Sequence, residues 1–357
     1  ESRGLGDVYK RQDLLKEDLH LSMAVNPELT ASNEIARILL FPETNKVETF
    51  MKGKVELVEY AVRDDSPLVG LPLGELYRKF QIQVLICAVK RIDEVYIPDG
   101  DFVLQAGDKM HIAASHQNLK NFFKSLMKKT VRIKNVLICG GGHLCFYLAL
   151  QLLQVGMQVK IIEKDSSRCE TLCELLPKAT VINADATSHD LLLEEGIGEA
   201  DAVVALTGMD EENIIMALFA KTQGVKKIIA KVNEDTRAQM VEGLGIDSIV
   251  SAKSATADAI LRYVRARKNS HDSANVESMY RLVNGQVEAQ EFIIKKECKY
   301  TNIPLKNLPT KPNTLIACIG RDRKVIIPNG DSHIEVGDSV IVVTKGRPID
   351  NFIDILA

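Results

Sequence analysis

Residues 136–165 read VLICGGGHLCFYLALQLLQVGMQVKIIEKD, and this stretch decides the fold of the segment that contains it. A short apolar run meets three glycines, an amphipathic helical pattern follows, and a second apolar run ends at the acidic Glu163. Strand, glycine turn, helix and strand in this order predict a parallel, doubly wound α/β sheet. Apolar runs and helical patterns keep alternating as far as residue 250, which supports the same prediction.

The composition limits the classes of function open to the chain. Its 357 residues leave room for more than one domain, and its net charge of −3 gives no general attraction to nucleic acid. No apolar run approaches the roughly 18 residues that a membrane-spanning helix needs. The seven cysteines include no C-x-x-C pair, so we expect reduced cysteines. Cys169 and Cys173, one helical turn apart, are a much weaker alternative as two metal ligands.

Two parts of the sequence repeat each other. MKGKVELVEYAV at 51–62 matches VNGQVEAQEFII at 283–294. Further along, VYIPDGDFVLQAGDKM at 95–110 matches VIIPNGDSHIEVGDSV at 325–340. Several matches in the same order indicate an internal duplication.

An earlier pair of segments extends the repeat. Residues 23–39 resemble residues 248–264, which in the second copy directly follow the doubly wound segment. We therefore expect two copies of a long unit, the first of which lacks most of its doubly wound domain. Residues 1–12 fit no element of either copy and are expected to be a foreign segment.

The repeat and the composition give the expected domains. These are a remnant of a first Rossmann-like domain at 13–45, a first small α+β module at 46–130, a second Rossmann-like domain at 131–268 and a second small α+β module at 269–357. In the small modules, short strands outnumber helices and turns such as Pro98-Asp99-Gly100 separate them. The polar stretch 267–278 is expected to join the last two domains.

The three glycines match two positions of the G-x-G-x-x-G fingerprint of dinucleotide-binding turns. Gly140 allows the tight turn, and Gly142 lets a pyrophosphate approach the start of the helix, where free N–H groups and the helix dipole attract anions. Cys145 occupies the third glycine position, which weakens the match modestly. The alternative is a glycine turn in an α/β fold that binds no ligand.

Glu163 strengthens the nucleotide interpretation. It ends the second strand about 20 residues after the glycines, where a carboxylate accepts hydrogen bonds from both ribose hydroxyls of an adenosine. The same charge repels a 2′-phosphate, so NAD or an adenine nucleotide is favoured over NADP. His143 lies within the loop and could sense charge or pH, but it has no convincing catalytic partner in the sequence.

Other candidate contacts follow the later strands. Asp185 and Ala186 are expected near an adenine edge, and Thr207 near the phosphates. A helix-start role for Asp185 is an equal alternative, and a solvated side chain is an equal alternative for Lys231, which could otherwise reach phosphates. Asp210 and the two acids after it are expected to provide negative charge at a helix start.

The order of these motifs resembles one family. The glycine loop, NADATSHDLLLEEGI, ALTGMDEENI, SATADAILRYVR and VIIPNGDSHIEVGDSVIV occur in the order typical of the regulators of potassium conductance. The resemblance covers nearly everything from about residue 13, and the duplication is similar to that of the peripheral, Trk-type members of the family. It implies NAD(H), or possible alternatives ATP and ADP, as the ligand. Carried over to this sequence, the implied contacts are Gly140, Gly141, Gly142, His143, Leu144, Glu163, Asp185, Ala186, Thr207 and, less firmly, Lys231.

The resemblance also implies a regulatory role. Such subunits form homo-oligomeric rings on the cytoplasmic face of the plasma membrane, peripheral to a membrane-embedded, TrkH-like potassium-translocating subunit. Nucleotide binding would rearrange the ring and alter the gate, with no catalysis. The alternative is an NAD-dependent dehydrogenase, which needs an acid–base residue and a carboxylate-binding arginine beside the nicotinamide.

The small modules carry a third interpretation. Asp101, Asp108, Asp331 and Asp338 recur beside glycines and could bind a cation. A turn role, in which each carboxylate accepts backbone N–H groups, is the favoured one. Arg91 and Arg321 match each other between the copies and are expected to be solvated.

Overall fold

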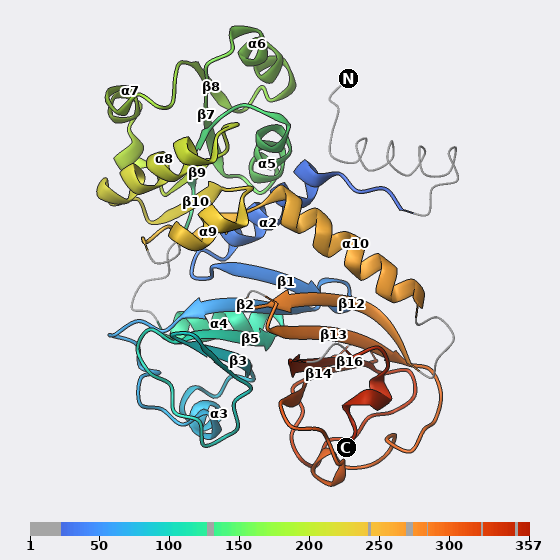
Figure 1. Cartoon of the computed structure of the whole chain (residues 1–357). Coiled ribbons are helices and arrows are strands. Elements are labelled where there is room, and N and C mark those ends of the chain that lie inside the picture. The colour runs from blue at the N-terminus through green and yellow to red at the C-terminus, as the bar shows by residue number, and fades with distance from the viewer. Residues whose placement is uncertain are drawn as a thin grey trace. The chain divides into compact units, whose positions relative to one another are not determined.

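The computed structural model describes residues 23–126, 132–241, 244–268, 274–283, 285–322, 324–346 and 349–357 (Figure 1). These residues form two compact units. One unit holds the described residues up to Pro42 together with those from 132 to Ala259. The other holds those from Glu43 to 126 and from Ile260 to Ala357. Each unit therefore combines two separate stretches of the chain.

A six-stranded parallel sheet forms the centre of the first unit (Figure 1). Its strands are β6 (Asn135–Cys139), β7 (Gln158–Glu163), β8 (Thr180–Asn183), β9 (Ala202–Ala205), β10 (Lys227–Lys231) and β11 (Ser248–Val250). Their order is β11-β10-β9-β6-β7-β8, and every neighbouring pair is parallel. The order reverses between β6 and β9, which is the switch point where sheets of this type bind ligands. The Rossmann-like, doubly wound fold predicted from the sequence is confirmed.

Helices cover both faces of this sheet. They are α2 (Pro27–Leu40), α5 (His143–Gln154), α6 (Ser166–Leu175), α7 (His189–Glu194), α8 (Asp210–Thr222), α9 (Asp235–Val241) and the first part of α10 (Ala252–Lys268), with a short 3-10 turn η3 (Ile197–Glu199). Val136 and Ile138 of β6 join a core with residues of α2, α5 and α6, whereas Leu137 and Cys139 join a core with residues of α7 and α8. The alternation arises because successive side chains of a strand point to opposite faces. None of the helices in the described part of the chain is long and apolar enough to cross a membrane.

Two small modules make up the second unit. The first contains β1 (Lys46–Phe50), η1 (Met51–Gly53), β2 (Val55–Ala61), η2 (Leu73–Glu75), α3 (Leu76–Phe80), β3 (Leu85–Arg91), β4 (Glu94–Tyr96), β5 (Lys109–Ala114) and α4 (His116–Leu126). The second contains β12 (Ala274–Leu282), β13 (Val287–Ile294), η4 (Leu305–Asn307), β14 (Thr314–Arg321), β15 (Lys324–Ile326), β16 (Ser339–Lys345) and η5 (Phe352–Ile355).

The modules share one topology. Their antiparallel sheets have the orders β1-β2-β5-β3-β4 and β12-β13-β16-β14-β15, which correspond strand for strand. The third strand of each module carries a register shift against the fifth, between Ile86 and Ala88 in β3 and between Ile316 and Cys318 in β14. The duplicated α+β architecture predicted from the sequence is confirmed.

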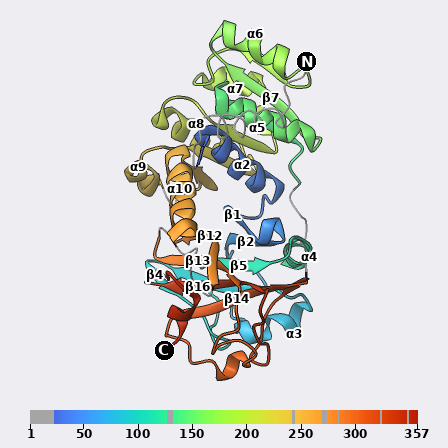
Figure 2. The ribbon, with the colours of Figure 1, turned by 90° about the vertical axis from the view of Figure 1, so that its right-hand side faces the viewer.

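The two modules pack on each other within the second unit (Figure 2). Phe50 and Leu57 of the first module and Tyr280 and Val287 of the second lie in one buried apolar core. The rings of Phe50 and Tyr280 meet edge to face, with centroids 4.8 Å apart. Regular structure extends into both ends of the polar stretch 267–278, because α10 continues to Lys268 and β12 begins at Ala274.

Candidate functional site

The glycine loop lies between β6 and α5, at the switch point of the sheet. Gly140 has φ +104°, a conformation that L side chains rarely adopt. A Cβ on Gly140 would stand 3.0 Å from the carbonyl of Leu206 and from the amide nitrogen of Thr207. Only glycine therefore lets this loop approach the end of β9 so closely.

The next two glycines have different roles. A Cβ on Gly141 would stand 2.8 Å from Leu172 Cδ1 and 2.9 Å from Glu163 Cγ, so there is no room for a side chain. Gly142 is the N-cap of α5, with φ −64° and ψ −173°, and a Cβ there would meet no described atom within 4 Å. The space beside Gly142 is open, and Gly142 directly precedes the N–H groups that begin a 12-residue helix.

The carboxylate of Glu163 fastens the loop to the end of β7. Its Oε2 accepts a hydrogen bond from the Gly141 amide at 2.6 Å, and its Oε1 accepts one from the Asp165 amide at 2.8 Å. A carboxylate has about four lone-pair sites, so both oxygens retain capacity for further donors. The arrangement places an acid with spare acceptor capacity directly beside the glycine loop.

Arg168 contacts this loop, a role that the sequence did not reveal. It lies in α6, and its Nε donates to the Gly141 carbonyl at 2.6 Å. Glu163 and Arg168 therefore hold the N–H and the C=O that flank the same glycine. The sequence alone could not predict this contact of Arg168. The contact depends on how the turn between β7 and α6 places the helix, and no sequence motif includes Arg168.

Asp185 and Ala186 follow β8, next to the acid of β7. The Ala184 amide donates to the Glu163 carbonyl at 3.0 Å, which ties the two strand ends together. Asp185 Oδ1 accepts from the Thr187 amide at 2.9 Å and from its hydroxyl at 2.8 Å, and these bonds lower the pKa of Asp185. Ser188, not Asp185, caps α7, so Asp185 stabilises a turn and the helix-start alternative is wrong.

A buried asparagine joins the other two predicted residues. Asn213 of α8 is fully buried, and its Oδ1 accepts from the Thr207 amide at 2.8 Å and from the Thr207 hydroxyl at 2.9 Å. Its Nδ2 donates to the carbonyls of Thr207 at 3.2 Å and Lys231 at 2.9 Å. Asn213 therefore fixes the ends of β9 and β10 against each other, a role that its place in the DEEN string did not indicate.

The side chain of Lys231 is half-buried. Burial lowers the pKa of its ammonium group, while the nearby acids Asp210 and Glu28 oppose that shift. The sequence left open a lysine that reaches phosphates and a solvated lysine, and a half-buried side chain near two acids does not fit a freely solvated one. Glu28 belongs to α2, so this helix contributes charge to the same edge of the sheet.

The remaining loop residues divide between surface and core. His143 is exposed at the first position of α5, whereas the side chain of Leu144 is buried in the core. Only the backbone of Leu144 is therefore available to a ligand at the loop. Cys145 is fully buried, and burial raises the pKa of its thiol, so this cysteine is an inert packing group at the third glycine position.

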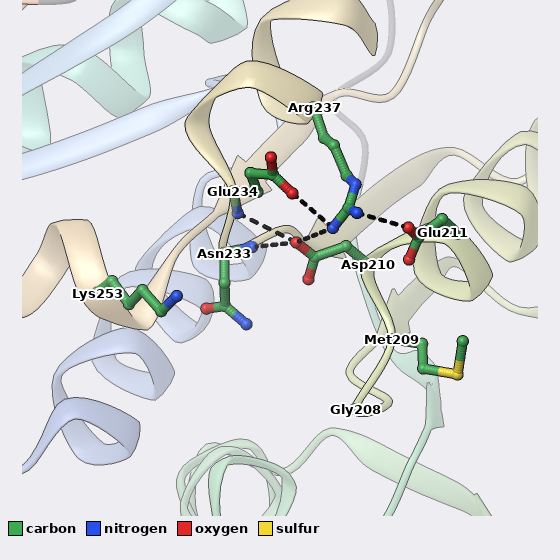
Figure 3. Close-up of a pocket in the computed structure, with 8 residues that line it drawn as sticks. All are labelled: Gly208, Met209, Asp210, Glu211, Asn233, Glu234, Arg237 and Lys253. Atoms are coloured by element: carbon green, nitrogen blue, oxygen red, sulfur yellow. Dashed lines mark hydrogen bonds and ion pairs between the residues drawn. The ribbon is translucent and has the colours of Figure 1, made fainter.

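An open pocket with a volume of about 540 Å³ lies beyond the switch point, at the ends of β9 and β10 (Figure 3). It is lined by Gly208, Met209, Asp210, Glu211, Asn233, Glu234, Arg237 and Lys253. Asp210 Oδ2 accepts from the amides of Asn233 at 2.9 Å and Glu234 at 3.1 Å. Arg237 forms ion pairs with Glu234 at 2.7 Å and Glu211 at 2.8 Å. The pocket is therefore polar and carries both signs of charge.

The recurring acids of the small modules have structural partners. Asp108 accepts from Arg91 Nε at 2.8 Å and Nη2 at 2.7 Å, and Asp338 accepts from Arg321 Nε at 2.9 Å and Nη2 at 2.8 Å. Each carboxylate also accepts a turn amide, from Gln105 at 2.8 Å and from Glu335 at 2.7 Å. The favoured turn role is confirmed for these two acids, and the expectation that both arginines are solvated is wrong. All seven cysteines are free, and no group of metal-ligating side chains occurs within the described residues.

Models of two protein-domain families match the chain. The TrkA-N domain model matches residues 136–252, and the TrkA-C domain model matches residues 57–127 and 289–357. The first of these ranges holds the parallel sheet and the glycine loop, and the other two hold most of the small modules. Among solved structures, the GsuK RCK domain has a TM-score of 0.55 at 18% identity, covering 93% of this chain and 70% of that chain. A structure described as the GsuK channel bound to NAD has a TM-score of 0.53 at 18% identity and covers 93% and 58%.

Curated relatives agree with the domain matches. The Trk system potassium uptake protein TrkA homolog 1 of Methanosarcina mazei is 30% identical over 323 residues, which cover 90% of this chain and 70% of that protein. The TrkA protein of Halomonas elongata is 31% identical over 334 residues, which cover 93% and 72%. The resemblance found in the sequence is confirmed. The chain belongs to the TrkA family of Trk-system potassium uptake proteins.

Proposed function

We propose that the chain is a regulatory subunit that binds NAD(H) or an adenine nucleotide and controls a membrane-embedded potassium-translocating subunit. The observation that carries this proposal is the glycine loop. Gly140 requires its positive φ, Gly142 leaves open space at the start of α5, and Glu163 binds the amide of Gly141 between them. Membership of a family of potassium uptake proteins supports the transport role.

The proposed phosphate site is the start of α5. Its first N–H groups have no partners within the helix, and the positive end of the helix dipole favours an anion there. The proposed contacts are the ten residues expected from the sequence: Gly140, Gly141, Gly142, His143, Leu144, Glu163, Asp185, Ala186, Thr207 and Lys231. Arg168 joins them as a cation that positions the loop.

The acid at the end of β7 favours an unphosphorylated ribose. The free lone pairs of Glu163 can accept ribose hydroxyls, and a 2′-phosphate would meet a like charge. The GsuK structure described as bound to NAD has a similar fold. This likeness supports NAD(H) as a class of ligand for the present chain. ATP and ADP remain the second class of ligand in the proposal.

The pocket beyond the switch point bears on the choice between these ligands. A mononucleotide at the glycine loop would leave the pocket at β9 and β10 empty, whereas the second nucleoside of a dinucleotide could enter it. Lys253 and Asp210 would then be further neighbours of the ligand. We therefore expect variants of Lys253 to affect NADH more than ADP.

The partners in this proposal are a TrkH-like membrane subunit and further copies of this chain. Homo-oligomerisation, as a ring on the cytoplasmic face of the membrane, is supported by apolar side chains on α8 and α9. Ile215 is 56% exposed and Met240 is 76% exposed, and the ion pair between Glu211 and Arg237 holds their helices together. Such apolar exposure fits a surface that a second copy covers. The proposed division into small regulatory modules at 46–130 and 269–357 and a nucleotide domain at 131–268 follows the same scheme.

Calorimetric titration with NADH, NAD⁺, ATP and ADP tests the nucleotide part of the proposal. The informative variant is Gly142→Ala, because its backbone angles suit alanine and the added methyl meets no described atom within 4 Å. We expect the wild-type chain to bind at least one of the four ligands, and Gly142→Ala to lose more than tenfold in affinity because the methyl occupies the phosphate position.

The matched control is Gly198→Ala. Gly198 lies in η3, just before β9 begins, whereas the glycine loop lies where β6 ends. Its added Cβ would meet Gln223 at an ordinary contact distance of 3.5 Å. Equal binding by both variants would contradict a phosphate site at the loop. Conversion of a hydroxy acid or amino acid by the chain with NAD⁺ would instead support the dehydrogenase alternative.

A further inference from the structure

Helix α2 belongs to the unit that holds the parallel sheet, although in the sequence it directly precedes the first small module. Ile35 and Leu39 of α2 are almost fully buried in the same core as Leu144 and Leu148 of α5. The first small module is therefore joined through α2 to a helix that begins at the glycine loop.

Two side-chain hydrogen bonds fasten α2 to α5. Asn26 Nδ2 donates to the Tyr147 hydroxyl at 3.3 Å, while Asn26 Oδ1 accepts from the Leu29 amide at 3.0 Å and caps α2. One turn further along, Gln151 Nε2 donates to the hydroxyl of the buried Ser32 at 3.0 Å. Tyr147 lies one turn after His143, so the first of these bonds is close to the loop.

Charge provides a second connection between α2 and the proposed site. Glu28, in the first turn of α2, is one of two acids that act on the half-buried Lys231. A nucleotide phosphate at Lys231 would compete with Glu28 for the same ammonium group. Ligand binding would thereby weaken an attraction that holds the start of α2 at the edge of the sheet.

The link from α2 to the first module is short and anchored at both ends. The Phe41 amide donates to the Arg37 carbonyl at 3.0 Å, and the Asn45 amide donates to the Glu59 carbonyl of β2 at 2.9 Å. Only Pro42, Glu43 and Thr44 lie between these anchors, and Thr44 is fully buried. So short a link has little slack to absorb a displacement of α2.

We propose that α2 senses occupancy of the glycine loop and passes it to the first small module through residues 41–45. The inference rests on the proposed nucleotide binding and names the element through which binding regulates the chain. A ligand acts on α2 at two places, through the start of α5 and through the exchange of partners at Lys231. The effect requires only that the ligand prefers one of two positions of α2.

Hydrogen–deuterium exchange of the full chain, with and without saturating NADH and ATP, tests the inference. In the wild-type chain we expect ligand to change exchange in β6 and α5, in α2, and in β1. In Tyr147→Phe, which loses the bond from Asn26, we expect the change at α5 to persist and the change at β1 to fall severalfold. Tyr77→Phe, in an exposed tyrosine of α3, is the matched control and should behave like the wild type.

A second variant tests the charge effect of Glu28 on Lys231 separately from the packing of α2 on α5. Glu28→Gln removes the acid that competes for Lys231, so we expect affinity for ATP to rise roughly fivefold and affinity for NAD⁺ to rise less. Glu174→Gln, an exposed acid on α6, is its control. Ligand-induced changes confined to residues 132–241, or unchanged affinities in Glu28→Gln, would overturn the role of α2 while leaving nucleotide binding intact. No change anywhere with either nucleotide would overturn the inference together with the proposed function.

Discussion

At the scale of single residues, the glycine loop shows how far a motif predicts a site. The strand–glycine–helix pattern located the loop and its acid, because both depend on local backbone geometry. The pattern could not reveal that Glu163 binds the Gly141 amide or that Arg168 binds the Gly141 carbonyl. The first contact depends on the pairing of β6 with β7 and the second on where α6 lies beside the loop, and both are set by tertiary packing.

The three glycines should respond differently to alanine. We expect Gly140→Ala to lower the free energy of unfolding by roughly 2 kcal/mol or more, because of its positive φ and the 3.0 Å approach of Leu206. Gly142→Ala should stay within about 0.5 kcal/mol of the wild type. Denaturant unfolding followed by circular dichroism measures both, and equal stability of the two variants would contradict the described loop geometry.

Asp201 makes stability depend on pH. Burial alone would raise the pKa of Asp201, but the hydrogen bond from Lys226 at 2.6 Å and those from the amides of Lys134 and Asn135 outweigh it and lower the pKa. A lowered pKa in the folded state stabilises the fold above the unfolded pKa of about 3.9, and this contribution is lost as the pH falls through the folded pKa.

The expected result for Asp201→Asn follows from the lowered pKa of Asp201, which stabilises the folded state at neutral pH. The variant should be less stable than the wild type by about 2 kcal/mol at neutral pH, and the difference should shrink below about pH 4. Urea unfolding at several pH values measures this difference. A loss of stability in Asp201→Asn that stays constant down to acidic pH would mean that the charge of the Asp201 carboxylate does not stabilise the fold.

At the scale of elements, the sequence predicted the types of structure better than their connections. Apolar periodicity was sufficient for the parallel strands and their helices, since each must bury one face. It could not show that α10 and β12 extend into the polar stretch 267–278, because polar residues are compatible with exposed faces of both elements. Nor could it pair Arg91 with Asp108, because that contact joins the end of β3 to a turn before β5.

The repeated arginine–aspartate pairs should each stabilise their module. Arg91→Ala leaves Asp108, which is 1% exposed, without its bidentate partner, and we expect a loss of roughly 3 kcal/mol. Arg321→Ala should have a similar cost, because Asp338 is equally buried. Arg63→Ala is the control, since its pair with Asp65 is exposed and should contribute less than about 1 kcal/mol. Thermal unfolding distinguishes these cases, and three equal costs would contradict the role of burial.

At the scale of the whole molecule, the duplication was the most informative feature of the sequence. It predicted two modules with one topology, and both sheets have corresponding strand orders. It did not predict that the modules would bury a common core, or that α2 would join the parallel-sheet unit, because single-sequence patterns do not specify partners between elements. The regulatory proposal depends on these long-range contacts, since a nucleotide acts at a distance only through elements that its site touches.

A nucleotide can shift such a molecule only by its preference for one state over another. A tenfold preference corresponds to about 1.4 kcal/mol per site, and several sites in a ring would add. The size of the regulatory effect should therefore depend on the number of occupied sites. A variant that cannot bind nucleotide should lose the effect and retain its fold.

The most direct measurement is potassium flux into vesicles that contain a Trk-type potassium-translocating subunit, with this chain added at the cytoplasmic face. We expect NADH or ATP to change the flux severalfold with the wild-type chain and with Gly198→Ala, and to have no effect with Gly142→Ala. An equal nucleotide response with Gly142→Ala, or no response with the wild-type chain, would contradict the account of a nucleotide-controlled regulator.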